Sequence, residues 1–339
     1  MRDRRTFAAT TPSILGLAAL ALAACAAGDV ADEDGEEAAT ASEALATCSA
    51  YGAPKAMGTV AWTVPSSSRD AVDEGSGIAA SWRHSGIYWL IDDGSAADNG
   101  ADARFFAVDR NGNARGRYKL SAPAANIDWE DAAVGPCSGA GLGAGSCLYI
   151  ADIGNNGGGR TKLHVYVTPE PTALAAGFET RTVSNWKKIT FSYAGGLTRN
   201  AESLLVHPVT GDVYVVTKKG GDAEVFVMRA PVGATVVAQR LAVLPQSRFR
   251  NAPFTAADFH PDGRRVILRT SRDGGTFTEI RNTGSRWDDI WATATSQIVG
   301  PWAGPPEGQG EAVTYSRSGV ALYSFGEGRN RPLHRTGCR

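Results

Sequence analysis

Three glutamates hold equivalent places in a phrase that the chain repeats five times. Each copy starts with a small or acidic residue that leads into an apolar run, and the five starting residues are Ser76, Glu130, Glu202, Thr255 and Glu311. Carboxylates that converge repel one another unless a cation neutralises them, and oxygen donors suit a hard cation such as Ca²⁺. The pattern therefore predicts a divalent-cation site.

Other oxygen donors lie beside these positions in the sequence. The full set of predicted metal ligands is Glu130, Glu202, Glu311, Asp128, Asn200 and Asp258. The alternative is structural: the acids would bond to backbone amides or to an arginine such as Arg199, Arg264 or Arg269, because buried acids are often paired within the fold.

The spacing of the copies indicates the elements that must position these residues. The starting residues are 54, 72, 53 and 56 positions apart, and each copy continues as an apolar run, a turn and a second apolar run. This period is expected when four strands form one blade of a β-propeller, whose inner strands line a central channel. We therefore expect an all-β propeller of five four-stranded blades, or of six if the longest interval hides irregular strands.

The last repeat lacks an outer strand of its own, since its pattern stops after Leu333. Residues 59–64, near the start of the domain, are the best source of that strand. Pairing of the N-terminal and C-terminal strands would remove an exposed sheet edge. The 40 glycines, 16 prolines and scarcity of helical periodicity agree with an all-β fold.

A second set of polar residues follows the second strand of each repeat. Its members are Asp92, Asp93, Asp152, Asn155, Asn156, Lys218, Lys219, Arg269 and Glu327. We expect this set on the channel face opposite the glutamates, unless the intervening loops fold inward. Because Asp, Asn and Gly suit tight turns, we interpret Asp152, Asn155 and Asn156 first as turn residues.

Four cysteines beyond the N-terminal segment predict two disulfides, since an even count is typical of exported proteins. Three connectivities are available to them. Cys137 and Cys147 flank a short Gly-rich loop, which makes them natural partners and leaves Cys48 with Cys338 at the other end of the domain. Their spacings fit no common zinc pattern.

The N-terminus predicts an export signal and a lipid anchor. Three arginines precede an apolar stretch at 14–24 that is too short to span a membrane, and Leu22-Ala-Ala-Cys25 fits the lipobox of bacterial lipoproteins. We expect cleavage after residue 24, acylation of Cys25 with palmitate among its chains, and anchoring in the bacterial cell envelope, at the outer rather than the inner membrane. An ordinary signal peptide that contains a cysteine is the alternative.

Residues 25–47 are predicted to be the lipidated Cys25 and an acidic tether, and residues 48–339 the propeller domain. The tether carries seven acidic and no basic residues, so it cannot bury enough apolar area to offset its ordering entropy. The whole chain has 34 Lys and Arg against 35 Asp and Glu, a net charge of −1. With no basic stripe interleaved with aromatic residues, we expect no nucleic-acid partner.

Five phrases, taken in order, carry a resemblance to a known group. They are Asp128-Trp-Glu-Asp, Ile150-Ala-Asp-Ile-Gly-Asn-Asn, Asn200-Ala-Glu-Ser, Thr255-Ala-Ala-Asp and Gln309-Gly-Glu-Ala. Over most of residues 74–330 the chain resembles uncharacterised exported bacterial β-propeller lipoproteins, which implies the fold and an acidic funnel. More distantly, the funnel is similar to that of propeller lactonases and phosphotriesterases, which hold a divalent metal with Glu, Asn and Asp.

These observations predict a lipid-anchored propeller of the cell envelope that binds a ligand or a protein partner, with an acidic channel mouth for Ca²⁺ or another divalent cation. The alternative is a metal-dependent hydrolase of esters, lactones or phosphoesters, with one of the three glutamates as general base. A quinoprotein dehydrogenase is a third class, although its histidine and arginine set is not identifiable here. The chain contains no serine-hydrolase elbow, P-loop, zincin or dinucleotide-binding motif.

Overall fold

The computed structural model describes residues 48–60, 72, 74–93, 103–218, 221–271 and 275–339. The chain divides into two units, Met1–Glu37 and Ala38–Arg339, and every described residue belongs to the second. The predicted signal, Cys25 and the acidic tether therefore lie outside the described residues. Within the described part, no helix has the length and apolar character needed to cross a membrane.

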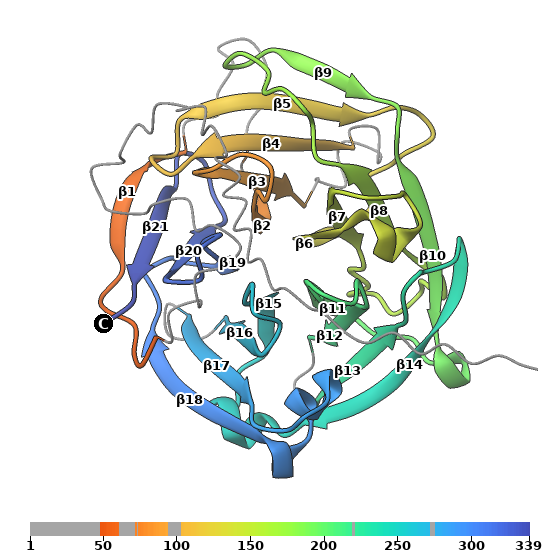
Figure 1. Ribbon diagram of the computed structural model, residues 1–339, viewed down its shortest axis with the longest axis vertical. Coiled ribbons are helices and arrows are strands. Elements are labelled where there is room, and N and C mark those ends of the chain that lie inside the picture. The colour runs from red at the N-terminus through yellow and green to blue at the C-terminus, as the bar shows by residue number, and fades with distance from the viewer. Residues whose placement is uncertain (1–47, 61–71, 73, 94–102, 219–220, 272–274) are drawn as a thin grey trace, which may run out of the picture. The chain divides into compact units, whose positions relative to one another are not determined.

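Five four-stranded blades surround one axis, as the sequence predicts (Figure 1). Blade 1 contains β2 (Gly75–Ala80), β3 (Ile87–Asp92), β4 (Arg104–Asp109) and β5 (Ala114–Leu120). Blade 2 contains β6 (Trp129–Pro136), β7 (Ser146–Asp152), β8 (Leu163–Pro169) and β10 (Lys187–Tyr193). Blade 3 contains β11 (Ala201–Val206), β12 (Val213–Thr217), β13 (Ala223–Met228) and β14 (Thr235–Leu244). Blade 4 contains β15 (Phe254–Phe259), β16 (Arg265–Thr270), β17 (Thr276–Asn282) and β18 (Ser296–Ala303).

Blade 5 closes the ring with strands from both ends of the domain. It contains β19 (Gly310–Tyr315), β20 (Ala321–Gly326), β21 (Pro332–Gly337) and, as its outer strand, β1 (Lys55–Thr59). The closure is confirmed, but the predicted strand at 59–64 was placed too late in the sequence. Tyr51 already bridges to Cys338, and this register sets Lys55 opposite Arg335. Of the predicted range, residues 61–64 lie outside the described residues.

The long second interval holds an extra strand rather than a sixth blade. β9 (Thr180–Val183) leaves blade 2 and pairs in parallel with β5 of blade 1, with Thr180 opposite Arg117. β10 and β14 also pair in parallel, which joins the outer edges of blades 2 and 3. These two pairings cover sheet edges that would otherwise be exposed.

Apolar residues form a separate cluster at each of the five blade interfaces. Trp89 of blade 1 packs in one cluster with Trp129 of blade 2, and corresponding clusters join blades 2 and 3, 3 and 4, 4 and 5, and 5 and 1. The strands β2, β11 and β19 are buried along their whole length. This distribution explains how a large domain grows by adding blades instead of enlarging one core.

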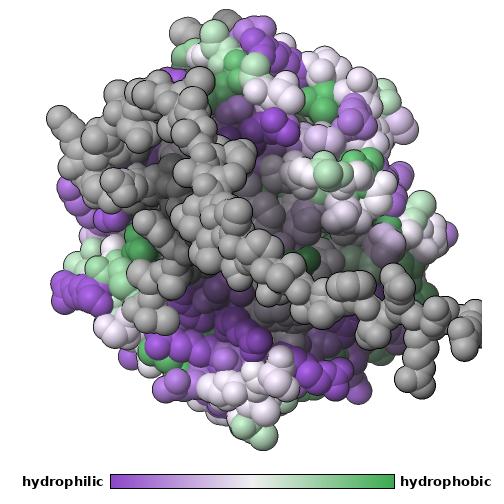
Figure 2. Space-filling view, in the orientation of Figure 1, coloured by the Kyte–Doolittle hydropathy of each residue, from purple (hydrophilic) through white to green (hydrophobic). Residues whose placement is uncertain are grey.

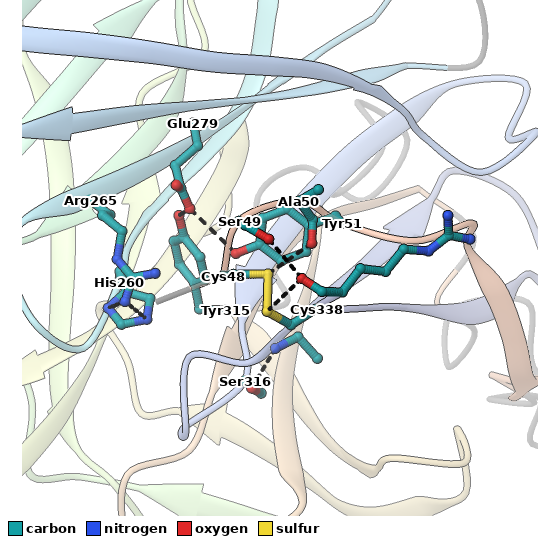
Figure 3. Close-up of a disulfide and its surroundings, with 12 residues drawn as sticks. Cys48, Ser49, Ala50, Tyr51, His260, Arg265, Glu279, Tyr315, Ser316 and Cys338 are labelled. Carbon is teal, nitrogen blue, oxygen red and sulfur yellow. Dashed lines mark hydrogen bonds between the residues drawn. A yellow bond between two sulfur atoms is a disulfide. The ribbon is translucent and has the colours of Figure 1, made fainter. Parts of the chain in front are cut away.

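Both predicted disulfides are present. Cys137–Cys147 spans the turn between β6 and β7, and Cys48–Cys338 joins the two ends of the domain with Cα atoms 5.3 Å apart. Beside the second bond, the hydroxyl of Tyr51 donates to Oε2 of Glu279 at 3.3 Å, and the hydroxyl of Tyr315 donates to the same atom at 2.8 Å (Figure 3). We call the disulfide, Tyr51, Glu279 and Tyr315 the clasp.

Candidate functional site: an acidic channel mouth

The start of each inner strand and the end of the second strand lie at one end of the channel. In the antiparallel register Gly75 pairs with Asp92, Trp129 pairs with Asp152, and corresponding pairs occur in the other blades. The expectation that the second polar set lies on the opposite face was therefore wrong. Antiparallel neighbours place the end of one strand beside the start of the other, so the two sets share one mouth.

The three glutamates all stand at this mouth and are almost completely buried. Glu130, Glu202 and Glu311 are 8%, 3% and 8% exposed. Oε1 of Glu202 forms an ion pair with Nζ of Lys218, which directly follows β12. Oε2 of Glu202 is buried and has no hydrogen-bond partner. One carboxylate oxygen at the mouth is thus left with its hydrogen-bonding capacity unused.

A glycine sets the positions of two carboxylates at this mouth. A Cβ atom on Gly154, just after β7, would lie 2.1 Å from Cγ of Asp128 and 2.2 Å from Oε1 of Glu130. Any side chain at this position would therefore collide with both groups. Gly154 creates a cradle in which the Asp128 and Glu130 carboxylates lie side by side.

Burial and mutual repulsion raise the pKa values of the acids at this mouth. Burial raises the pKa of Glu130 well above its ordinary value, and the charges of Glu202, Asp93 and Asp128 raise it further. The pKa of Glu311 rises to about 7, through burial and then through the charge of Glu202. The mouth therefore favours either protonation or a bound positive charge.

Lys218 supplies positive charge within the cluster. Burial alone would lower its pKa, but Glu202 first and then Glu311 and Glu130 raise the pKa above its ordinary value. For Glu202, burial outweighs the ion pair with Lys218, so the pKa of Glu202 is also raised.

We define the acidic mouth by the residues whose charges are coupled in this way. They are Asp93, Asp128, Glu130, Glu202, Lys218, Glu311 and Glu327. Asp93, Lys218 and Glu327 were left out of the predicted site. Their place at the ends of second strands, combined with antiparallel pairing, was the signal that could have identified them.

Asn200 lies next to the acidic mouth but is held in a contact between blades. Its Oδ1 accepts from the backbone N–H of Asn155 at 2.5 Å, and its Nδ2 donates to Oδ1 of Asn156 at 2.9 Å. Asn155 in turn accepts from the N–H of Arg160 and donates to its carbonyl, and Asp152 forms an ion pair with Arg160 at 2.7 Å. These contacts give the Asp152, Asn155 and Asn156 segment the turn role that the sequence predicts.

Asp258 does not join the other predicted ligands. Its Oδ2 accepts from the Thr314 hydroxyl at 2.7 Å and from the backbone N–H of Tyr315 at 3.0 Å. Thr255, the counterpart of the glutamates, lies three residues earlier on β15, and three residues of strand span about 10 Å. Asp258 is therefore at the opposite mouth, where burial raises its pKa to about 7.

Asp131 crosses the channel between the two mouths. Its fully buried carboxylate accepts from the backbone N–H groups of Ala132 at 2.8 Å, Leu204 at 2.9 Å and Ala257 at 3.4 Å. The donors belong to three different blades. One side chain thus satisfies unpaired N–H groups of neighbouring inner strands and separates the two ends of the channel.

The two hydroxyl residues in the repeat also connect blades. Ser76 donates to the carbonyl of Trp129 in blade 2 at 2.8 Å, and Thr255 donates to the carbonyl of Gly310 in blade 5 at 2.9 Å. At these two positions the repeat serves the ring itself, whereas the three glutamates leave carboxylates at the mouth.

Three arginines that the sequence suggested as structural partners of the acids contact other groups instead. Arg269 is fully buried and pairs with Glu307, Arg199 pairs with Glu224, and Arg264 lies 4.6 Å above the ring of Trp287. Within the described ranges, none of these arginines forms an ion pair with the three glutamates; Lys218 provides that contact.

The carboxylates of the acidic mouth are suitable ligands for a hard divalent cation. In the structure, however, the ammonium of Lys218 neutralises one of them, Glu202. In the part of the chain that the structure describes, no group of three or more His, Cys, Asp or Glu residues has metal-binding spacing. The carboxylates cradled by Gly154 and the unpartnered oxygen of Glu202 are suitable oxygen donors. To bind, a divalent cation would have to displace the Lys218 ammonium from Glu202.

Solved structures with a similar arrangement include a luciferin-regenerating enzyme, with 9% identity over 79% of this chain and 92% of that chain, at a TM-score of 0.42. XC5397, a gluconolactonase from Xanthomonas campestris, shows 11% identity over 80% of this chain and 88% of its own, also at 0.42. A putative 6-phosphogluconolactonase from Bacteroides uniformis shows 11% identity over 78% and 67%, at 0.38. Similarity this low carries no activity over to this chain. No protein-family model matches the sequence, and no curated protein matches it.

Proposed function

We propose that the protein is a ligand-binding module of the bacterial cell envelope, anchored by a lipid at Cys25, whose acidic mouth binds a divalent cation such as Ca²⁺. The observation that carries this proposal is the charge imbalance at the mouth. The six carboxyl groups of the acidic mouth are electrostatically coupled to one another or to the ammonium of Lys218, and the three glutamates are nearly buried. Glu74 and Asp92 add negative charge nearby, and Arg269, which is itself paired with Glu307, acts on Glu311. Buried charges are stable only when they are paired or coordinate a metal.

A divalent cation would neutralise the negative charge of these carboxylates better than Lys218 does. Ca²⁺ accepts six to eight oxygen ligands, so it can use several carboxylates at once, whereas Lys218 forms its ion pair with Glu202 alone. Because the pKa values of Glu130, Glu202 and Glu311 are raised, metal binding should release protons and become tighter as the pH rises.

A metal-dependent hydrolase is the second candidate. Glu202 favours it, because its buried Oε2 has no partner and its raised pKa suits a general base. Such an enzyme needs a substrate pocket beside the metal. The pocket that we describe below lies at the opposite mouth, with Asp131 between the two ends, so that pocket could not hold the substrate of such an enzyme.

Calorimetric titration of the purified protein with CaCl₂ tests the proposal. Glu202→Gln removes one carboxylate charge with little change in shape and should weaken calcium binding by about tenfold or more. Lys218→Met removes the competing ammonium and should strengthen binding by about the same factor.

The opposite signs of these two effects distinguish a cation site from a structural cluster. If the acids only hold blades together, both variants should lower the melting temperature and neither should change calcium binding. That result, or the absence of any calcium binding by the unaltered protein, would contradict the proposal. Calcium-dependent turnover of ester, lactone or phosphoester substrates, lost in Glu202→Gln, would favour the hydrolase instead.

A further inference from the structure

The mouth opposite the acidic one contains a pocket. All five inner strands contribute to its wall through Ala80, Val134, Val206, Phe259 and Tyr315, which lie at or next to the ends of β2, β6, β11, β15 and β19. The pocket therefore sits on the channel axis. It is small, with room for little more than a water-sized group, and polar atoms make up more of its exposed wall than apolar atoms do, although most of the residues that line it are apolar or aromatic.

Pro208, Pro261, Trp82 and the exposed Arg317 also line this pocket. Trp82 is only partly buried and packs on the cluster between blades 1 and 2. An indole at the edge of a pocket offers both an apolar surface and a π face to a ligand.

A single carboxylate faces this pocket. Asp258 is the one residue of β15 that is not fully buried, and it lines the pocket. It accepts hydrogen bonds from Thr314 and Tyr315, both neutral donors. Among the described ion pairs, none involves Asp258, and Arg317 is not among the groups whose charge affects it.

Asp131 adds a second carboxyl group behind the first. The two carboxylates lie close enough that the charge of Asp258 contributes to raising the pKa of Asp131. The partners of Asp131 are three backbone N–H groups, which are also neutral. This end of the channel therefore holds two carboxyl groups and, in the described part of the chain, no cation paired with either.

We propose that this pocket binds a small primary ammonium compound, with the ammonium on Asp258 and its hydrocarbon part against Trp82 and Phe259. The ammonium supplies the missing positive charge at the carboxylate, and cation–π attraction to an indole or phenyl face adds to the binding. Asp258 is the one carboxylate among the residues that line the pocket, which favours an ammonium group over a metal ion, since the metal ion requires several oxygen ligands. This site is distinct from the acidic mouth, because Asp131 lies between them.

The test uses n-butylammonium and its neutral counterpart 1-butanol as probes of the ¹⁵N-labelled protein, with the Trp82 indole N–H followed by NMR. We expect n-butylammonium to bind about tenfold or more tightly than 1-butanol. Asp258→Asn keeps an oxygen that can accept from Thr314 and Tyr315 but removes the charge, so this preference should disappear. Glu202→Gln is the matched control at the other mouth and should retain the preference.

Three results would overturn the inference: equal affinity for the two probes, no binding of n-butylammonium, or a preference that survives Asp258→Asn. If that variant fails to fold, the unaltered protein still decides the question. A shift of the Trp82 indole signal on addition of n-butylammonium supports the pocket. Shifts confined to the acidic mouth, such as at Gly154, contradict it.

Discussion

The two ends of the channel are built from the same five inner strands but differ in their chemistry. At the start of the strands lies a cluster of six coupled carboxyl groups and Lys218, which pairs with Glu202. Figure 2 shows one face of the molecule, on which hydrophilic residues gather over part of the surface that is not grey. At the end of the strands, a small pocket lined mostly by apolar and aromatic residues contains the carboxylate of Asp258. Five-fold repetition fixes the scaffold, whereas single positions within each repeat decide which ligand chemistry each mouth supports.

The ends also differ in how the fold braces them. The pocket end is tied by the clasp, since Tyr315 both lines the pocket and donates to Glu279 beside the Cys48–Cys338 bond (Figure 3). At the acidic mouth, Arg269 forms an ion pair with Glu307 and donates hydrogen bonds to the carbonyls of Ala312 and Phe325. A covalent closure thus supports one mouth and a buried ion pair the other.

Removing the clasp disulfide should have the largest effect. Changing both Cys48 and Cys338 to Ser opens a loop of 290 residues, and loop-closure entropy predicts a loss of about 6 kcal/mol in unfolding free energy. The matched pair of changes at Cys137 and Cys147, which close a loop of 10 residues, should remove about 3 kcal/mol. Urea unfolding measures both values, and equal losses would show that ring closure does not depend on the clasp.

Gly154→Ala should disturb the acidic mouth alone. The new methyl group would overlap the carboxylates of Asp128 and Glu130, so we expect about 1–3 kcal/mol of destabilisation and calcium binding about tenfold weaker. Gly157 is the control, because a Cβ there meets no atom within 4 Å. If Gly157→Ala weakens calcium binding as much, or if Gly154→Ala weakens n-butylammonium binding, the two mouths are not independent.

The last expected effect is a pH dependence of stability, for which the pKa shift of Glu311 sets an upper bound of about 3 kcal/mol. The pKa of Glu311 is about 7 in the folded state against an ordinary 4.5, so the folded state binds more protons between these values and its stability falls as the pH rises through them. Histidines with lowered pKa values, His207 among them, have the opposite sign, so the unaltered protein must be compared with Glu311→Gln.

Thermal unfolding at several pH values checks this dependence. The variant should lose less stability than the unaltered protein between about pH 5 and pH 7, and saturating calcium should reduce the difference. Asp258 has the same sign, because its pKa is also about 7, but calcium should leave its contribution unchanged. An effect of calcium on both contributions would argue against separate sites.

The fold could be predicted from the sequence because it rests on repetition. Copies at Glu130, Glu202 and Glu311 indicate blades, and cysteines at both ends indicate ring closure; the structure has both features. The exact closing strand could not be predicted, because Lys55–Thr59 is mostly exposed or half-buried and lacks a clear apolar alternation. Its register is set instead by pairing with β21, which lies far away in the sequence.

The candidate site was predictable only in part. The positions of Glu130, Glu202 and Glu311 follow from the repeat, whereas Lys218 and Asp93 join them only because antiparallel pairing brings the end of each second strand beside the start of the first. The cradle at Gly154 could not be predicted, because close approach of two side chains to a glycine depends on contacts that have no local sequence pattern. The pocket at Asp258 likewise combines strand ends from all five blades.

Elemental analysis of the purified protein, with its melting temperature measured before and after chelation, tests the central claim most directly. The account predicts about one divalent ion per chain, a clear fall in melting temperature when the ion is removed, and recovery when calcium is restored. A protein that contains no divalent ion, and whose melting temperature changes with neither chelation nor added calcium, would contradict the claim that the acidic mouth is a cation site.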